Sequence, residues 1–127
     1  MPPAKTKHDA TSIMALVRGH KPSSAKVGIF DIDGVFRGKY MSADKLESSL
    51  KSGFGFCDVV LGWDSTDQLY DNVAFTGWHT AYPDAGVRLI PETLRHIPFE
   101  GGMPLILAEF TGSAEAICPR GLLKRVL

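Results

Sequence analysis

The sequence has few cysteines, no excess charge of either sign and no long hydrophobic run. Its two cysteines, Cys57 and Cys118, are too few for a disulfide scaffold. A single disulfide between them is the alternative, and two buried thiols in a cytoplasmic protein are the favoured interpretation. Lysine and arginine number 14, as do aspartate and glutamate, so the formal net charge is zero. This balance argues against nucleic-acid and polybasic membrane binding. The longest apolar runs, such as 105–108, are far shorter than the roughly 20 residues that span a bilayer.

Two further absences narrow the class of protein. No apolar stretch follows the basic segment 1–7, so we expect no secretory signal, and no repeat or low-complexity block is visible. The 127 residues, 44% of them apolar and 22% charged, suit one globular domain. The 13 glycines and 8 prolines favour a turn-rich fold with strands over a helix bundle. We expect residues 1–10 to form a flexible tail.

Apolar spacing predicts two complete helices. The first follows a cap at Asp9 or Thr11 and ends at Gly19. Its buried face is predicted to consist of Ile13, Leu16 and Val17. The second helix covers roughly residues 43–52 and is capped by Ser42.

The rest of the pattern predicts strands. Six are expected, at residues 26–32, 35–41, 56–61, 87–90, 105–110 and 113–118. The first two flank Asp33-Gly34, a signal for a two-residue hairpin turn in which both residues take positive φ. Arg37 and Lys39 alternate with aromatic residues in the second strand, which predicts one solvent-exposed face.

The segment 62–86 is rich in Gly, Asp, Asn and Thr and is predicted to be a long loop with one short hairpin near 64–67. Long loops in compact domains usually carry function or bind a partner. Residues 121–127 begin a further helix. The order of elements predicts an α+β domain with a mixed sheet.

One short motif suggests a phosphatase. The segment 27–34, Val-Gly-Ile-Phe-Asp-Ile-Asp-Gly, resembles the first motif of haloacid-dehalogenase-type phosphatases. That resemblance implies Asp31 as nucleophile and Asp33 as acid and base beside Mg²⁺. The family also needs a paired-carboxylate motif, and no Gly-Asp-x-x-x-Asp occurs in the sequence. A hairpin turn explains Asp33-Gly34 without catalysis, so the phosphatase is an alternative interpretation.

Three stretches in a fixed order carry a longer resemblance. Segment 37–41 reads Arg-Gly-Lys-Tyr-Met, and segment 88–98 reads Arg-Leu-Ile-Pro-Glu-Thr-Leu-Arg-His-Ile-Pro. The chain closes with Cys-Pro-Arg-Gly-Leu-Leu-Lys-Arg-Val at 118–126. Together they resemble the N-terminal domain of the glutamine synthetase family, in a branch similar to the γ-glutamyl-amine ligases. The resemblance implies an α+β fold with a β-grasp-like mixed sheet of about five to six strands, packed with one or two helices.

The resemblance also places candidate site residues on the long loop. The family loop has an aromatic-Asp pair followed, seven residues after the Asp, by a Trp that is preceded by Gly. Tyr70-Asp71 and Gly77-Trp78 fit that spacing. Asp71 is thereby expected to bind and deprotonate the attacking ammonium or amine, and Trp78 to lie near the nucleotide of the adjoining subunit. Asp64 is the competing carboxylate if the loop aligns with a shift.

Four other polar residues complete the list of candidates. Asp84 is expected to be a second carboxylate of the loop. Arg120 is a candidate for the domain junction, where it would pair with a carboxylate, and a plain surface arginine is the alternative. His79 and His96 lack the spacing of metal ligands, so no metal site is expected in this chain.

One departure from the family pattern bears on the substrate. The ammonia-using members have Gly-Ser-Ser after the loop aspartate, where this sequence has Asn72-Val73-Ala74. These side chains offer fewer polar groups to line a pocket for an ammonium ion. The departure therefore points to a larger amine, or leaves the nucleophile undefined.

The resemblance implies a larger ligase around this chain. Residues 11–118 would be its N-terminal domain, and 119–127 would begin the linker or helix into a C-terminal catalytic domain that is absent here. The parent is expected to be a cytoplasmic enzyme that uses ATP and Mg²⁺ or Mn²⁺ to join glutamate to ammonia or an amine. The chain would supply its loop to the adjacent subunit of a homo-oligomeric ring, and alone it would bind no cofactor and be inactive. A non-catalytic β-grasp interaction module is the remaining alternative.

Overall fold

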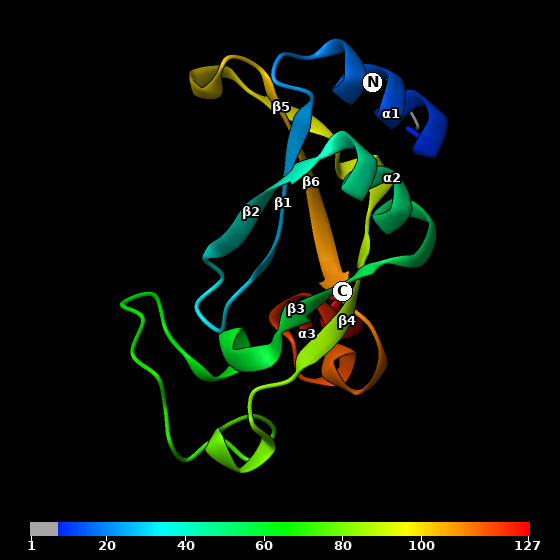
Figure 1. The fold of residues 1–127 in the computed structure, drawn as a ribbon. Helices are drawn as coiled ribbons and strands as arrows, with labels where there is room; N and C mark the ends of the chain where they lie inside the picture. The colour runs from blue at the N-terminus through cyan, green and yellow to red at the C-terminus, as the bar shows by residue number, and fades with distance from the viewer. Residues whose placement is uncertain (1–7) are drawn as a thin grey trace.

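Figure 1 shows the fold of residues 8–127, the part of the chain that the computed structural model describes. The predicted flexible tail at 1–10 lies mostly outside this range. Within residues 8–127 the helices and strands are α1 (Ala10–Gly19), β1 (Ser24–Phe30), β2 (Phe36–Ser42), α2 (Ala43–Ser52), β3 (Phe54–Cys57), β4 (Asp84–Leu89), β5 (Arg95–Ile97), β6 (Met103–Phe110) and α3 (Pro119–Val126). No helix in that range is long and apolar enough to cross a membrane.

The strands form one mixed sheet in the order β2-β1-β6-β4-β3, with β5 beside β6. The central pair β1 and β6 is parallel, and every other pair is antiparallel. In Figure 1 α1 and α2 lie beside each other next to the upper part of the sheet, and α3 lies near its lower end. This arrangement confirms the predicted α+β fold with a mixed sheet.

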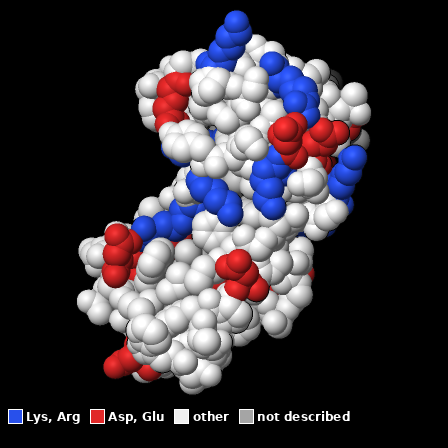
Figure 2. Space-filling view, in the orientation of Figure 1, with Lys and Arg blue, Asp and Glu red and all other residues white. Residues whose placement is uncertain are grey.

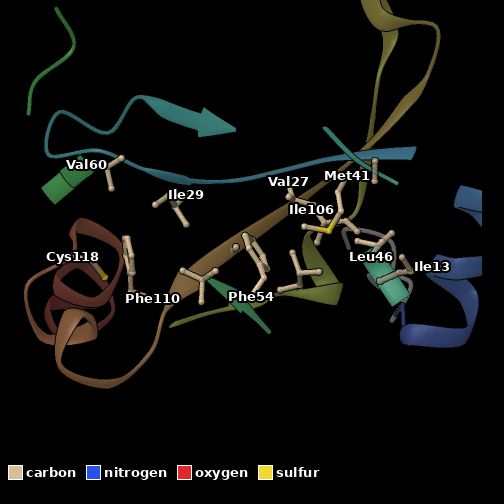
Figure 3. Close-up of a cluster of buried hydrophobic side chains, with 14 of the residues drawn as sticks. Ile13, Val27, Ile29, Met41, Leu46, Phe54, Val60, Ile106, Phe110 and Cys118 are labelled. Atoms are coloured by element: carbon tan, nitrogen blue, oxygen red, sulfur yellow. The ribbon is translucent and has the colours of Figure 1, made fainter. Parts of the chain in front are cut away.

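The hydrophobic core fills the space between the helices and one face of the sheet (Figure 3). Ile13 of α1 and Leu46 of α2 lie near Val27 of β1 and Ile106 of β6, and all four are fully buried. At the other end of the core Phe110 lies near the 3-10 and helical segments that follow it. Each such side chain contributes about 1.5–3 kcal/mol when fully buried.

The first helix begins as predicted. Asp9 caps α1 by accepting a hydrogen bond from the backbone N–H of Ser12 at 2.8 Å. Ile13 and Val17 lie one turn apart and are buried. Leu16, predicted on the same face, is 40% exposed. The buried stripe of α1 is therefore a single i, i+4 row, narrower than the predicted face.

The hairpin between β1 and β2 has a longer connection than predicted. Phe30 pairs with Phe36, so residues 31–35 form the connection, and the prediction of a two-residue turn is wrong. Among them Gly34 alone has a positive φ, 78°. The side chain of Asp31 explains the difference, because it accepts hydrogen bonds from the N–H groups of Asp33 and Val35 and so organises a wider turn.

Three predicted segments also differ. The strand expected at 56–61 ends at Cys57, and 58–62 is a 3-10 helix. The connector 91–98 contains β5. The strand expected at 113–118 is wrong, since 112–116 forms a 3-10 helix. Both edges of β6 are already taken, by β1 on one side and by β4 on the other, so no edge is free for a hairpin there.

The face of β2 predicted to be solvent-exposed is only partly so, since Lys39 is exposed but Arg37 is half-buried. Arg37 and Lys39 pair with Ile29 and Val27, and directly opposed residues of antiparallel strands point to the same side. They therefore share the face that carries the core. The Arg37 side chain is only 20% exposed, whereas Tyr40 of the other face is 58% exposed.

Candidate active site

The candidate site lies on residues 58–83, called here the long loop, which connect β3 to β4. The loop extends away from the sheet at the lower left of Figure 1. No lysine or arginine occurs from residue 58 to residue 87. The aspartates of this stretch are Asp58, Asp64, Asp67, Asp71 and Asp84. On the face drawn in Figure 2, Lys and Arg lie over the upper and middle parts, and the charged side chains of the lowest part are acidic.

Asp64 organises the first turn of the long loop. Its carboxylate accepts hydrogen bonds from the N–H groups of Thr66 and Gln68 at 2.9 and 3.0 Å, and from the hydroxyl of Tyr70 at 2.7 Å. The Tyr70 hydroxyl, followed by the Thr66 hydroxyl, holds the pKa of Asp64 well below its usual range. The carboxylate is thus committed to its own turn.

The tip of the β1–β2 hairpin holds this turn from the side. Asp31 is fully buried and accepts a hydrogen bond from Arg37 Nε at 2.8 Å. Arg37 Nη1 reaches Asp67 Oδ1 at 2.6 Å, and Asp33 accepts the N–H of Ser65 at 2.8 Å. The hairpin tip and the first turn of the long loop are therefore linked by several direct hydrogen bonds.

These contacts argue against Asp31 as a nucleophile. Burial raises the pKa of Asp31, but the hydrogen bonds from Val35 and Arg37 outweigh it, so the pKa lies below its usual range. Both carboxylate oxygens accept hydrogen bonds from the chain itself. A carboxylate that is buried and saturated in this way organises a turn and is not free to attack a phosphate ester.

A second tether holds the far part of the long loop. Asp58 and Thr76 are both buried, and the Thr76 hydroxyl donates a hydrogen bond to the Asp58 carboxylate. The N–H of Asp58 also donates to the carbonyl of Pro83 at 3.1 Å. A buried polar pair that satisfies both partners fixes the path of the backbone.

Asp71 lies between these two tethers. It directly follows Tyr70, whose N–H donates to the carbonyl of Gly62 at 2.9 Å, and it precedes Thr76 by five positions. The Asp71 residue is exposed, and within residues 8–127 no hydrogen bond or ion pair engages its carboxylate. Asp84, at the start of β4, is also exposed and likewise without a side-chain partner in that range.

Trp78 lies on the outer part of the long loop. It is 80% exposed, and its ring meets the ring of Tyr82 edge to face at 5.3 Å. Most of a large apolar side chain is thus open to solvent. Tryptophans in this state often contribute to binding surfaces.

The remaining candidates make contacts inside the domain. Arg120 of α3 donates to Glu109 of β6 at 3.0 Å, so its partner lies within this chain. Glu109 is buried and also pairs with Arg88 and Lys124. Burial raises the pKa of Glu109, but Arg88 and the other two cations outweigh it and lower the pKa.

The histidines and cysteines hold no metal site in the described chain. His79 and His96 each lie within 2.9 Å of a backbone carbonyl oxygen, of Ala74 and Gly102. Residues 8–127 contain no group of three or more His, Cys, Asp or Glu that is placed to hold a metal ion. Cys57 and Cys118 are both free thiols; Cys118 is buried and Cys57 is partly exposed.

Sequence patterns alone missed three residues that hold the long loop, namely Arg37, Asp58 and Thr76. Arg37 was assigned to an exposed face because alternation along a strand does not reveal which face is covered by a distant loop. Asp58 and Thr76 lie 18 positions apart, and nothing local signals their pairing.

Comparisons with known proteins decide the family. No protein-family model matches the chain. The chain is 48% identical to type-1 glutamine synthetase 2 of Dictyostelium discoideum over 118 residues, which is 91% of the chain. It is 30% identical to glutamate–isopropylamine ligase of Pseudomonas sp over an alignment of 129 residues, covering 97% of the chain. The chain belongs to the glutamine synthetase family. An N-terminal domain of that family fits both the fold and the matched relatives.

Solved structures agree on the fold of this domain. Ligand-free GmaS superposes with a TM-score of 0.64 at 21% identity, and the match covers 92% of the chain. The chain spans about a quarter of the length of its relatives, 23% of the Dictyostelium protein and 28% of the Pseudomonas protein. Those relatives therefore contain a large additional region to which nothing in this chain corresponds.

Proposed function

We propose that the chain is the N-terminal domain of an ATP-dependent ligase that joins the γ-carboxyl group of glutamate to an amine. In this proposal the long loop supplies Asp71 to an active site shared with a neighbouring subunit. The observation that carries it is the state of Asp71: within the long loop its carboxylate is exposed and unpaired, while the backbone on both sides is tethered. The backbone around Asp71 is fixed, its carboxylate has no partner among the described residues, and no basic residue lies nearby in the sequence. Such a carboxylate suits the binding of a cationic amine.

The chemistry requires a group of this kind. An alkylammonium ion must lose a proton before its nitrogen can attack. In the proposed reaction the γ-carboxylate of glutamate takes the terminal phosphoryl group of ATP and becomes an acyl phosphate. The amine nitrogen then bonds to the γ-carbonyl carbon, the carbon–oxygen bond to phosphate breaks, and phosphate leaves with the electron pair. Asp71 would accept hydrogen bonds from the ammonium group and take up its proton.

Asp64 and Asp84 are less suited to this role. All the contacts of Asp64 serve its own turn, and freeing its carboxylate would cost the hydrogen bonds of Thr66 and Tyr70. Asp84 is free but lies in β4, opposite Cys57, at the far end of the loop. We therefore assign the primary role to Asp71 and keep Asp84 as a second carboxylate of the loop.

The amine is proposed to be larger than ammonia. Asn72, Val73 and Ala74 follow Asp71, and the side chains of Val73 and Ala74 offer apolar contacts. A small alkyl group on the amine would gain from such contacts, whereas ammonia would not. The 30% identical relative from Pseudomonas is named for a ligase of glutamate and isopropylamine, which is consistent with this choice.

The parent would need parts that this chain lacks. ATP and Mg²⁺ or Mn²⁺ would supply the phosphoryl chemistry, and their ligands would lie in a C-terminal catalytic domain. The exposed Trp78 would then approach the nucleotide of the adjacent subunit in a homo-oligomeric ring, and the linker helix α3 would lead to the catalytic domain. A cytoplasmic location fits the two free thiols.

Turnover by the longer polypeptide tests this proposal. The chain is expressed together with the coding sequence that continues beyond Leu127, and phosphate release is measured with ATP, glutamate and a panel of ammonia and small alkylamines. We expect release that depends on both glutamate and an amine. Residues 1–127 alone should release no phosphate. Adding the catalytic domain to this chain should give activity.

Two results would contradict the proposal. A coding sequence that stops at Leu127, with a partner protein recovered on the chain, would favour the non-catalytic interaction module. Phosphate release that is indifferent to glutamate would exclude a γ-glutamyl ligase. A preference for ammonia over every alkylamine would leave the ligase standing but would overturn the assignment of a larger amine.

A further inference from the structure

We propose that Arg37 is the residue that positions the long loop, and with it Asp71, against the tip of the β1–β2 hairpin. The loop-holding part of this inference stands on contacts within the chain. Its catalytic consequence rests on the role proposed above for Asp71.

Arg37 joins the β1–β2 hairpin to the long loop through one guanidinium group. Its Nε donates to Asp31 Oδ2 at 2.8 Å, within the hairpin. Its Nη1 donates to Asp67 Oδ1 at 2.6 Å, and its Nη2 donates to the backbone carbonyl of Asp64 at 2.9 Å, both in the long loop. The guanidinium carbon also lies 5.0 Å from the centre of the Trp63 ring.

The geometry of these contacts requires arginine. The planar guanidinium presents five N–H donors in a fixed fork, and here the fork is spread over a buried carboxylate, an exposed carboxylate and a carbonyl. An ammonium group at the end of a lysine stem is a single point of charge and cannot reach all three. Asp31 fixes the fork, because it is fully buried and its other oxygen is held by the backbone of the turn.

The consequence for Asp71 follows from the short stretch of backbone between Asp71 and the loop residues that Arg37 contacts. Arg37 holds Trp63, the Asp64 carbonyl and Asp67, and the backbone then returns to Gly62 through the N–H of Tyr70. Asp71 is the next residue. If the Arg37 contacts are lost, the turn 63–70 keeps its own hydrogen bonds and the one from Ser65 N–H to Asp33, but it loses the contacts that fix it to β2. If Asp71 is displaced in this way, the enzyme loses a large part of the rate gain that comes from orienting the amine for attack.

Hydrogen exchange on the 127-residue chain tests the loop-holding part. Arg37→Lys retains the charge and the stem, so the fold should persist, and Arg37→Met removes the charge as well. We expect amides of residues 62–83 to exchange about tenfold faster or more in Arg37→Lys, and faster still in Arg37→Met. Amides of β1 and β6 should be unchanged. Arg95→Lys is the matched control, because Arg95 is exposed and its hydrogen bond goes to the nearby Thr93 carbonyl.

A spectroscopic signal separates this role from general stabilisation. In a Trp78→Phe background Trp63 is the single tryptophan, since the chain has two. Arg37→Lys should increase the quenching of Trp63 fluorescence by acrylamide, because the guanidinium no longer covers the ring. If loop exchange and quenching in Arg37→Lys both match the parent chain, the inference is overturned.

Kinetics of the longer polypeptide test the catalytic consequence. Arg37→Lys should raise the KM for the amine about 10- to 100-fold and leave the KM values for glutamate and ATP within about twofold. An equal rise in all three KM values would reduce Arg37 to a structural residue and overturn the positioning role. The two proposals fail separately. An Asp71→Asn enzyme with full activity removes the role of Asp71, while the exchange result for Arg37 would still hold.

Discussion

At the scale of single residues, the aspartates of the long loop differ in how many donors surround them. Asp64 accepts hydrogen bonds from the backbone and hydroxyl of Thr66, from Gln68 and from Tyr70. Its carboxylate is therefore fully engaged within one turn. Asp71, seven positions later, has no such donors among the described residues. The same side chain thus organises a turn at one position and is available to a ligand at the other.

Histidine 20 provides a pH-dependent contact at the same scale. The ring of His20 lies 3.0 Å from the carbonyl oxygen of Pro22 through Nδ1 and 3.0 Å from that of Gly101 through Nε2. Carbonyl oxygens only accept, so both ring nitrogens donate when the imidazole is protonated. The hydrogen bond to Pro22, followed by that to Gly101, raises the pKa of His20.

We expect the stabilisation from His20 to depend on pH in one direction. Since the folded-state pKa is raised, the contribution is fully present below the unfolded value of about 6.5 and is lost as the pH rises through the folded pKa. Urea unfolding of the wild type and of His20→Gln, measured from about pH 5 to pH 9, checks this. The difference in the free energy of unfolding should shrink as the pH rises, and a difference that grows with pH would contradict the assignment.

At the scale of elements, the β1–β2 hairpin depends on a pair of glycines. Gly28 lies directly opposite Gly38, and the ring of Phe36 lies against both. A Cβ placed on Gly28 would come within 2.6 Å of Gly38 Cα and 2.7 Å of Phe36 Cζ. The absence of side chains at this point is what lets the ring close over the hairpin.

Alanine at Gly28 should therefore destabilise the domain. We expect Gly28→Ala to lower the free energy of unfolding by about 1–3 kcal/mol, because neighbouring backbone must move to admit the methyl group. Gly19→Ala is the control, since no heavy atom lies within 4 Å of its Cβ position. That change should be neutral or add up to about 1 kcal/mol through helix propensity. Equal stability of Gly28→Ala and wild type in urea would exclude the close contact.

Elements with strong local signals could be predicted from the sequence, and elements defined by distant partners could not. The α2 helix follows directly from its Ser42 cap and the Gly53 stop. The 3-10 segment at 112–116 could not be predicted, because its sequence tolerates a strand and only the occupied edges of β6 exclude one. In the same way, alternation in β2 suggested a solvent-exposed Arg37, while the long loop that covers it comes from 30 positions further along.

At the scale of the whole molecule, the domain combines a rigid sheet with a long segment held at two places. The sheet and its hydrophobic core account for the fold, and the tethers at Arg37 and at Asp58–Thr76 carry the loop beyond it. The exposed apolar residues of the C-terminal region, Leu122, Leu123, Val126 and Leu127, and the exposed Trp78 offer surface to the further parts of the proposed ligase. In the proposed ligase, the domain would act by presenting the Asp71 carboxylate in a defined place.

The most direct test of this account is the amine dependence of the longer ligase with Asp71→Asn. The substitution keeps the size of the side chain and removes its charge and its capacity to take a proton. We predict a loss of about 100-fold or more in kcat/KM for the amine, with the KM values for ATP and glutamate unchanged. Glu92→Gln, which removes an exposed carboxylate outside the long loop, should match the wild type. An Asp71→Asn enzyme with the amine kinetics of the wild type would contradict the account.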